Sequence, residues 1–545
     1  MLYWANERCF SNFLTDNSKF SEGYIERSTS SVGLSLGRKF KGFTQLRRHA
    51  TRADPWLALA LFLALLFAGS SHAWAREPDT REKSPPVLGP PFNAQIARNS
   101  LLVVDESDPV AGVSWAGNDV ANYVPNAATL RDGTLTASTD TVVTASHLAA
   151  LLGGQETVRI NVDELLVAPG VTIRLPGLQL AIDATRVVIA GALDVSGARA
   201  GHITVEADDV EITSTGRIRA NGDVGGGNVY IGGEWQGSGN LRSANRIVMA
   251  TGSRIESSAR EEGTGGTVVL WADPADTSAL VEVRGEIVIR GGRRFGNGGR
   301  IETSAPRLAV DDIRVHTGAV AANSQPGMWL IDPRDITISS SATSDATGSS
   351  PYTSTVTSGS TVANINASTI ATALASGNVT VSTDGDGSMN GDITVSAEIS
   401  AGGTNTLTLN AARDIVLSAR IRRTSTGGVT LVATTGVLRG SGSLALSGGT
   451  VSLTQGGNNA SGSPYSGAIT GVGTSFTKAG AGTLIVSGAS TFSGATTISA
   501  GTLRLGAMDK WSDESAVTVE SGATFDFNNY DDAVGSIAGA GSVTL

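Results

Sequence analysis

The stretch "GTLIVSGASTFSGATTISAGTLRLG", residues 482–506, states one short phrase twice. Gly482-Thr-Leu-Ile-Val returns as Gly501-Thr-Leu-Arg-Leu, and related phrases begin at Gly522 and Gly541. Within each phrase apolar residues alternate with other residues, which is typical of a β-strand that buries one face. The repeat therefore predicts a series of short strands that are joined by turns.

The alternation also predicts which side chains of these strands are buried. Leu484, Leu503 and Phe525 hold the same place in three successive phrases and should form one inward column. Arg504 and Asp526 lie at the intervening places and should face water.

A looser pair of phrases recurs earlier in the chain. The first phrase is "GALDVSG" at 191, "GRIRANG" at 216, "GSRIESS" at 252 and "GEIVIRGG" at 285. Its companion is "GHITVEA" at 201, "GNVYIGG" at 227, "GTVVLWA" at 266 and "GRIETSA" at 299. Each phrase predicts a short strand, bounded by glycine or small polar residues that suit tight corners.

The short period of the phrases, with strands and few helices, limits the possible architectures. A propeller blade needs about 40–45 residues, and an antiparallel sandwich has no reason to repeat its sequence. Stacked coils with parallel strands bury an apolar face that no single repeat could bury alone. We therefore predict an all-β parallel solenoid of about 20–25 coils, with short helical insertions beginning at Ser146 and Ser368.

Residues 1–75 have the features of an extended signal peptide. Basic residues precede the apolar run "WLALALFLALLFA" at 56–68, and Ala73 and Ala75 then form a small-x-small cleavage motif before Arg76. The run is shorter than the roughly 20 residues that span a bilayer as a helix, which disfavours a membrane anchor. Whether the stretch ahead of the apolar run, 1–55, is a genuine part of the signal stays open.

Charge and cysteine content exclude some classes of protein. The chain has 545 residues and a net charge of -10, which disfavours nucleic acid as a partner, since phosphate binding needs a basic face. The one cysteine, Cys9, lies in the predicted leader. The histidines at 147, 202 and 316 are isolated from one another, so a zinc site is not expected. We predict no cofactor.

Catalysis by carboxylates is the main alternative that the sequence offers. Hydrolysis of a glycosidic bond needs two carboxylates about 5–10 Å apart. The adjacent pairs 208/209, 311/312 and 531/532 would point to opposite faces of a strand, although stacked coils can still bring acids together. Asp332 and Asp335 suit a corner of the chain better than an active site. No catalytic residue is predicted.

The segment "TDGDGSMNGD", residues 383–392, raises the possibility of calcium binding. Alternating oxygen-bearing residues from Asp384 to Asp392 resemble the ligands of a calcium loop, but Met389 stands where the turn glycine belongs. A Gly- and Asp-rich turn between two strands accounts for the segment equally well, so both interpretations stay open.

Several stretches resemble known families. Residues 265–305, with "GMWLIDPRDITIS" at 327–339 and the stretch at 390–421, resemble filamentous-haemagglutinin-like exoproteins of Gram-negative bacteria. The tail from "FTKAGAGTLIVSG" onward resembles the β-strand repeat associated with autotransporter passengers. The resemblance implies a right-handed parallel β-helix, secretion or display at the outer membrane, and frequently adhesion.

The resemblance also implies a transporter in the outer membrane. Two-partner exoproteins carry Asn-Pro motifs, whereas this chain has the reversed order at Val124-Pro125-Asn126. An autotransporter ends in its own membrane barrel, whereas this sequence stops within a repeat at Leu545. The expectation is therefore either a separate partner transporter or a carboxyl-terminal barrel that is missing from the sequence, and the secretion route stays open.

These observations divide the chain into segments. The predicted segments are an extended signal peptide at 1–75, a disordered Pro-rich start at 76–110, a haemagglutinin-like β-helix at 111–337, a Ser/Thr/Gly-rich loop at 338–364, a second β-helix section at 365–440 and strand repeats at 441–545.

The function expected from the sequence is non-catalytic adhesion to cells or surfaces. The alternatives are a β-helical enzyme that degrades polysaccharide, and a purely structural stalk. The ligand, a host-cell or glycan group, cannot be read from the sequence, because outward Tyr230, Trp235 and Trp271 would either bind it or only cover the surface.

Overall fold

The computed structural model describes most of the chain after residue 98, within the compact unit Val87–Leu545. The described residues are 99–105, 124–333, 335–341, 363–383 and 390–545. The predicted signal peptide, with Ala73, Ala75 and Arg76, lies outside them, so its cleavage stays a prediction.

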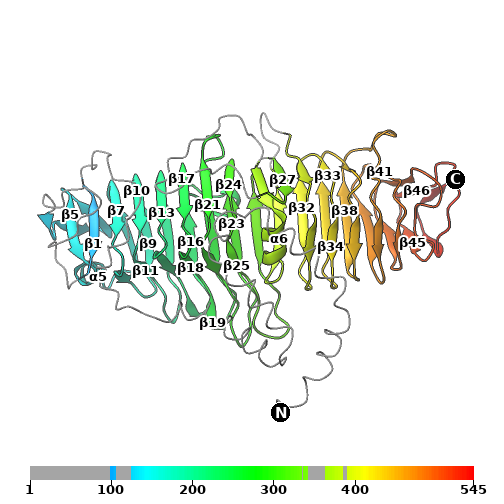
Figure 1. Cartoon of the computed structure of the whole chain (residues 1–545). Helices are drawn as coiled ribbons and strands as arrows, with labels where there is room; N and C mark the ends of the chain where they lie inside the picture. The colour runs from blue at the N-terminus through cyan, green and yellow to red at the C-terminus, as the bar shows by residue number, and fades with distance from the viewer. Residues whose placement is uncertain (1–98, 106–123, 334, 342–362, 384–389) are drawn as a thin grey trace, which may run out of the picture. The chain divides into compact units, whose positions relative to one another are not determined.

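A typical coil of the fold has three short strands. One coil consists of β12 (His202–Glu206), β13 (Asp209–Ile212) and β14 (Arg217–Arg219). The chain then returns to β16 (Asn228–Ile231), which pairs in parallel with β12 so that Val229 lies opposite Ile203. Repetition of this path stacks parallel strands along three faces, which we call the first, second and third faces (Figure 1). The predicted all-β parallel β-helix is confirmed.

The first face is the most continuous sheet, and its parallel strands pair one after another in chain order. Besides β12 and β16 they are β4 (Thr134–Ala137), β6 (Thr157–Asn161), β9 (Gln179–Asp183), β20 (Thr267–Trp271), β23 (Arg300–Ser304), β26 (Met328–Asp332), β29 (Asn378–Ser382), β32 (Leu407–Ala411), β35 (Val429–Ala433), β38 (Thr450–Gln455), β40 (Ser475–Ala479), β43 (Thr496–Ile498), β45 (Ala516–Val519) and β47 (Ser536–Gly539). At the start of the sheet, β3 (Ala128–Arg131) pairs antiparallel with β4.

These strands mark the successive coils, and within the described residues they are fewer than the coils that the sequence predicted. The short period of the opening phrases holds near the carboxyl end, where β43 begins at Thr496 and β45 at Ala516. In the middle, however, β16 begins at Asn228 and β20 only at Thr267, so one coil there is almost twice as long. The long coils carry extra loops outside the three faces, including the pair β15 (Gly222–Val224) and β19 (Ala259–Glu262).

The second face begins within the segment that the sequence assigned to a Pro-rich start. There β1 (Leu101–Val104) is buried and pairs with its two neighbours, β5 and β7. The strands of this face are, in chain order, β1, β2 (Val124–Pro125), β5 (Thr141–Thr144), β7 (Glu164–Val167), β10 (Arg186–Ile189), β13, β17 (Arg246–Met249), β21 (Leu280–Val283), β24 (Arg307–Ala309), β27 (Ile336–Ser339), β28 (Ala363–Asn366), β30 (Ile393–Val395), β33 (Ile415–Leu417), β36 (Leu438–Arg439), β41 (Thr483–Val486), β44 (Thr502–Leu505), β46 (Thr524–Asp526) and β48 (Ser542–Thr544).

The third face contains the phrases that begin at 191, 216, 252 and 285. They form four neighbouring strands in parallel register, so this part of the prediction is confirmed. The whole face comprises β8 (Thr172–Arg174), β11 (Ala192–Asp194), β14, β18 (Arg254–Glu256), β22 (Glu286–Val288), β25 (Arg314–His316), β31 (Ile399–Ala401), β34 (Ile421–Arg423), β37 (Leu444–Leu446), β39 (Ile469–Gly471) and β42 (Thr491–Phe492).

The core is a column of inward side chains. Leu503 lies between Leu484 and Phe525 in register, and all three are 0% exposed, which confirms the predicted column. Arg504 is partly exposed as expected, but Asp526 is buried, and its carboxylate accepts a 2.7 Å hydrogen bond from Nε of Arg504. The prediction that Asp526 faces water was wrong, because an outward side chain is covered when its neighbour one coil away folds over it.

The two predicted helical insertions are present, but their caps differ from the expectation. In α5 (Ala145–Leu152) the cap is Thr144 rather than Ser146, and its Oγ1 accepts from the backbone N of His147 at 3.2 Å. In α6 (Ala367–Ala373) the cap is Asn366 rather than Ser368. Among the described residues no helix has the length and apolar character needed to cross a membrane.

Candidate functional site

The helix α6 interrupts the third face between β25 and β31, and it contacts both strands. The first face continues past it, because β26 pairs directly with β29. The second face continues as well, with β28 next to β24 and paired with β27. A helix with its side chains is about 10 Å wide, whereas paired strands lie about 4.8 Å apart. A helix in the place of a strand therefore leaves a seam on the third face.

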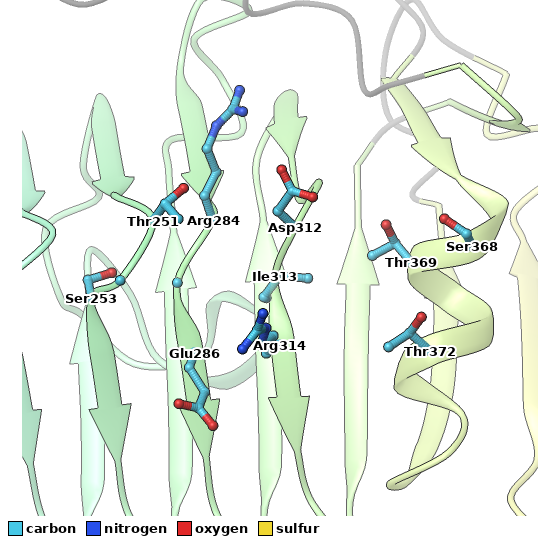
Figure 2. Close-up of a pocket in the computed structure, with 12 residues that line it drawn as sticks. Thr251, Ser253, Arg284, Glu286, Asp312, Ile313, Arg314, Ser368, Thr369 and Thr372 are labelled. Carbon is cyan, nitrogen blue, oxygen red and sulfur yellow. The ribbon is translucent and has the colours of Figure 1, made fainter. Parts of the chain in front are cut away.

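A groove of about 620 Å³ lies at this seam (Figure 2). We call it the seam groove. The residues that line it are Thr251, Gly252, Ser253, Arg284, Gly285, Glu286, Asp312, Ile313, Arg314, Ser368, Thr369 and Thr372. All but the last three lie where three successive coils turn from the second face to the third, and the last three belong to α6. Turns that are far apart in the sequence are thus brought into one polar site.

Two of the charged groups in the seam groove are held by other side chains. Nε of Arg284 donates to the carboxylate of Glu282 at 2.6 Å, and the Glu282 side chain is only 3% exposed. The carboxylate of Glu286 accepts from Arg254 at 2.9 Å and lies 3.1 Å from Nε2 of His316. Burial lowers the pKa of His316, and the nearby arginines lower it further.

The other two charged groups are available. Asp312 and Arg314 make no ion pair and no side-chain hydrogen bond with the residues that the structure describes. Ile313 between them turns inward and is 6% exposed. Figure 2 shows Asp312 on one side of Ile313 and Arg314 on the other, with Thr369 and Thr372 of α6 opposite them. A carboxylate and a guanidinium therefore face one groove without protein partners in the described part of the chain.

Most carboxylates that the sequence singled out have structural partners. Asp208 pairs with Arg242, and Asp209 accepts from Arg246 at 2.8 Å. Asp335 accepts from the backbone N of Asp392 at 2.8 Å. Asp532 accepts from the backbone N of both Lys510 and Trp511, while its neighbour Asp531 is exposed. Of the three adjacent pairs, only the one at 311/312 reaches the seam groove, through Asp312.

The three aromatic residues that were candidates for a binding surface have different surroundings. Trp271 packs beneath the loop that contains η4 (Trp235–Gly237), since a Cβ added at Gly233 or Gly237 would come within 2.6 or 2.9 Å of its ring. The guanidinium of Arg300 lies 4.5 Å from the ring centre of Trp235. Tyr230 is partly buried, which raises its pKa. Trp271 is thus a packing residue, and one face of Trp235 is occupied.

The histidines and the candidate calcium segment do not form a metal centre in the described part of the chain. His147 lies in α5, and Nδ1 of His202 accepts from the backbone N of Asn228 at 3.0 Å. Among the described residues no group of three or more His, Cys, Asp and Glu could hold a metal ion. Residues 384–389 lie outside that part, so calcium stays untested there. Asp392, at the end of the segment, is bound by Arg413.

The sequence alone did not predict the seam groove. Its charged residues come from "RGE" at 284–286 and "DDIR" at 311–314, which look like ordinary polar turns. The available signal was positional, because both turns and "TGS" at 251–253 precede strands of the same face. That signal does not by itself predict a groove. The groove forms because α6 replaces the next strand of the third face.

Comparison with known protein families gives a match near the carboxyl end of the chain. Residues 476–505, from β40 to β44, match the family called passenger-associated-transport-repeat. No curated protein matches the chain. The match agrees with the resemblance of the tail to the repeats of autotransporter passengers. The repeat supports an autotransporter passenger, a class of protein that is secreted or exposed at the cell surface.

Proposed function

We propose that this protein is a non-catalytic adhesin of a Gram-negative bacterium, which attaches cells to other cells or to surfaces. The passenger-associated repeat at 476–505 carries the proposal, since it associates the chain with export. An outer-membrane transporter, as a separate protein or as a domain of the same polypeptide, would deliver the chain to the surface. The parallel β-helix then supplies a long stack of outward side chains and loops for binding.

The use of the carboxylates supports binding rather than catalysis. A general acid needs a raised pKa and access to substrate. Asp209 and Asp335 instead accept hydrogen bonds within the protein. The pKa of Asp392 is lowered, because the hydrogen bonds from Arg413 and from the backbone of Asp414 outweigh its burial. The hydrogen bonds that these three carboxylates accept within the protein support structural roles for them.

One observation favours the second candidate, a polysaccharide-degrading enzyme. Glu286 and Asp312 both line the seam groove, and two carboxylates in one groove are the minimal equipment of a glycosidase. Glu286, however, already has protein partners, since its carboxylate accepts from Arg254 at 2.9 Å and lies 3.1 Å from Nε2 of His316.

The test uses the full-length chain and two assays, saturable binding to host cells and release of reducing sugar from polysaccharides. Asp208, Asp311, Asp332 and Asp335 are each changed to Asn, and Glu286 to Gln. We expect saturable binding that all four Asn variants retain, without sugar release. Sugar release that one of these substitutions abolishes would contradict the proposal, because acid and base act as a unit. A chain that binds no cell or surface would instead be a structural stalk.

A further inference from the structure

We propose that the seam groove binds an oligosaccharide that carries a carboxylated sugar. In this arrangement the guanidinium of Arg314 pairs with the sugar carboxylate, and the carboxylate of Asp312 accepts hydrogen bonds from sugar hydroxyls. The inference rests on the proposed function, since it names the ligand class and the place where an adhesin of this kind would bind it.

The lining of the seam groove suits a hydroxylated ligand. It combines hydroxyls of Ser and Thr residues with two guanidiniums and two carboxylates, and its one large apolar residue, Ile313, is 6% exposed. Hydroxyl groups both donate and accept hydrogen bonds, guanidiniums only donate and ionised carboxylates only accept. Sugar hydroxyls can satisfy all three kinds of group. A lipid chain or an apolar peptide would leave them without partners, at a cost of about 1–3 kcal/mol for each desolvated group.

The size of the groove also fits a short oligosaccharide. Its volume of about 620 Å³ lies within the range of about 300–1,000 Å³ that small-molecule sites occupy. It extends over the turns at 251–253, 284–286 and 312–314, and strands of successive coils lie about 4.8 Å apart. The groove therefore exceeds the dimensions of a single small ion.

The charges indicate which sugar would be preferred. Arg284 and Glu286 are already neutralised by protein partners, so the free charges are those of Asp312 and Arg314. Arg314 is exposed, and its planar fork matches a carboxylate in a bidentate pair. A compact dianion such as phosphate would be repelled by Asp312. An acidic sugar instead presents a carboxylate to Arg314 and hydroxyls to Asp312.

The walls of the groove are held in place before a ligand arrives. Asp312 adopts a left-handed backbone with φ 61°, which sets the direction of its Cα–Cβ bond. A Cβ added at Gly285 would come within 2.3 Å of Oγ of Ser253, so the turns of successive coils are closely packed there. A site that is already ordered loses less conformational entropy on binding.

The test is calorimetric titration of the full-length chain with 3′-sialyllactose, lactose, trigalacturonate and its methyl ester. The two acidic probes represent an animal-cell and a plant source of the same chemistry, and each has a neutral counterpart. We expect at least one acidic probe to bind at least about 10-fold more tightly than its neutral counterpart, because the neutral sugar has no carboxylate to pair with Arg314. Arg314→Ala should remove that difference, and Arg314→Lys should retain part of it.

Arg422→Ala is the matched control, since Arg422 is an exposed third-face arginine outside the groove. It should leave binding unchanged, and circular dichroism confirms that each variant is folded. The groove proposal is wrong if cells still attach but neither acidic probe binds. It is also wrong if Arg314→Ala does not change the binding of the probes. Either result leaves the adhesin function itself unaffected. Loss of all attachment in the unaltered chain would contradict the proposed function itself.

Discussion

The coils before α6 and the coils after it both bury apolar side chains in the core, but their outward side chains differ. Before α6, the second face stacks Glu164, Arg186, Asp209 and Arg246 in register, so acids and arginines alternate from coil to coil. After α6, the first face stacks short hydroxylated residues, which are Thr380, Thr408, Thr430, Ser452 and Thr477. Parallel stacking therefore tolerates either a charge ladder or a hydroxyl ladder on its outward positions.

The interiors differ as well. From β6 to β20 the inward positions of the first face hold aliphatic residues such as Ile203 and Val268. Near the carboxyl end the interior contains aromatic rings. The ring centre of Trp511 lies 5.1 Å from that of Phe476 and 5.4 Å from that of Phe492.

The largest expected effect lies in the core and should be the same in both regions. Leu503→Asp and Ile218→Asp each place a carboxylate where the native side chain is 0% exposed. Each should lower the free energy of unfolding by at least about 4 kcal/mol, through the cavity and the unpaired charge. Urea unfolding followed by circular dichroism measures it. A loss in only one region would show that the two interiors are not equivalent.

A smaller effect should be confined to the carboxyl-terminal region. Lys478 is 0% exposed, its ammonium contacts the carbonyl oxygens of Ala479, Gly480 and Ala500, and burial lowers its pKa to about 8. Between pH 8 and the unfolded pKa of 10.5 the unfolded chain binds more protons than the folded chain. Stability should therefore rise with pH in this window, by about 2–3 kcal/mol.

Lys478→Met should remove this rise, because methionine does not titrate. Urea unfolding of both proteins at pH 7.5 and pH 10.5 gives the change in unfolding free energy for each. Subtracting one change from the other removes the contribution of the tyrosines, which both proteins share. If the variant shows the same pH dependence as the unaltered protein, burial does not lower the pKa of Lys478.

Next in size is the ion pair of Arg504 with Asp526, whose side chains are 42% and 11% exposed. Arg504→Ala leaves the buried carboxylate without its partner and should cost about 1–2 kcal/mol. Arg422→Ala, the same change at an exposed arginine, should cost under about 0.5 kcal/mol. If thermal or urea unfolding shows equal losses of stability for Arg504→Ala and Arg422→Ala, Asp526 is exposed to water, as the sequence alone suggested.

The smallest effect concerns the charge ladder before α6. Arg186 lies 3.4 Å from Asp209 and 3.6 Å from Glu211, and all three side chains are partly exposed. Arg186→Ala should cost under about 1 kcal/mol, and the loss should shrink as salt is raised to about 1 M. Thr430→Ala in the hydroxyl ladder is the control, and its cost should not depend on salt. A salt-independent loss at Arg186 would mean that its packing matters more than its charge.

The sequence predicted the features that each coil repeats. The alternation in "GTLIV" and "GTLRL" fixed the register of Leu484 and Leu503, and the glycine-bounded phrases predicted four neighbouring strands of the third face. It did so because the core imposes the same period-two pattern on every coil.

Features that depend on neighbouring coils could not be read in this way. The burial of Asp526 depends on Arg504 one coil away, and the seam groove depends on α6 replacing a strand. In the described part of the chain the coils are fewer than predicted, because loops of different length close equivalent coils, so chain length does not convert into a number of coils at one period.

The most direct test asks whether the first face continues across the seam, which is what confines the groove to the third face. In a Cys9→Ser background, Met328→Cys and Asn378→Cys place cysteines at paired positions of β26 and β29, which are distant in the sequence. Paired strands about 4.8 Å apart fall within the range of about 4.4–6.8 Å that a disulfide spans. The control couples Met328→Cys with Val379→Cys, whose side chain points to the opposite face. Mass spectrometry under mild oxidation should find an intramolecular disulfide in the first protein and none in the control. Disulfide formation in the control instead, or in neither protein, would contradict the continuous stack.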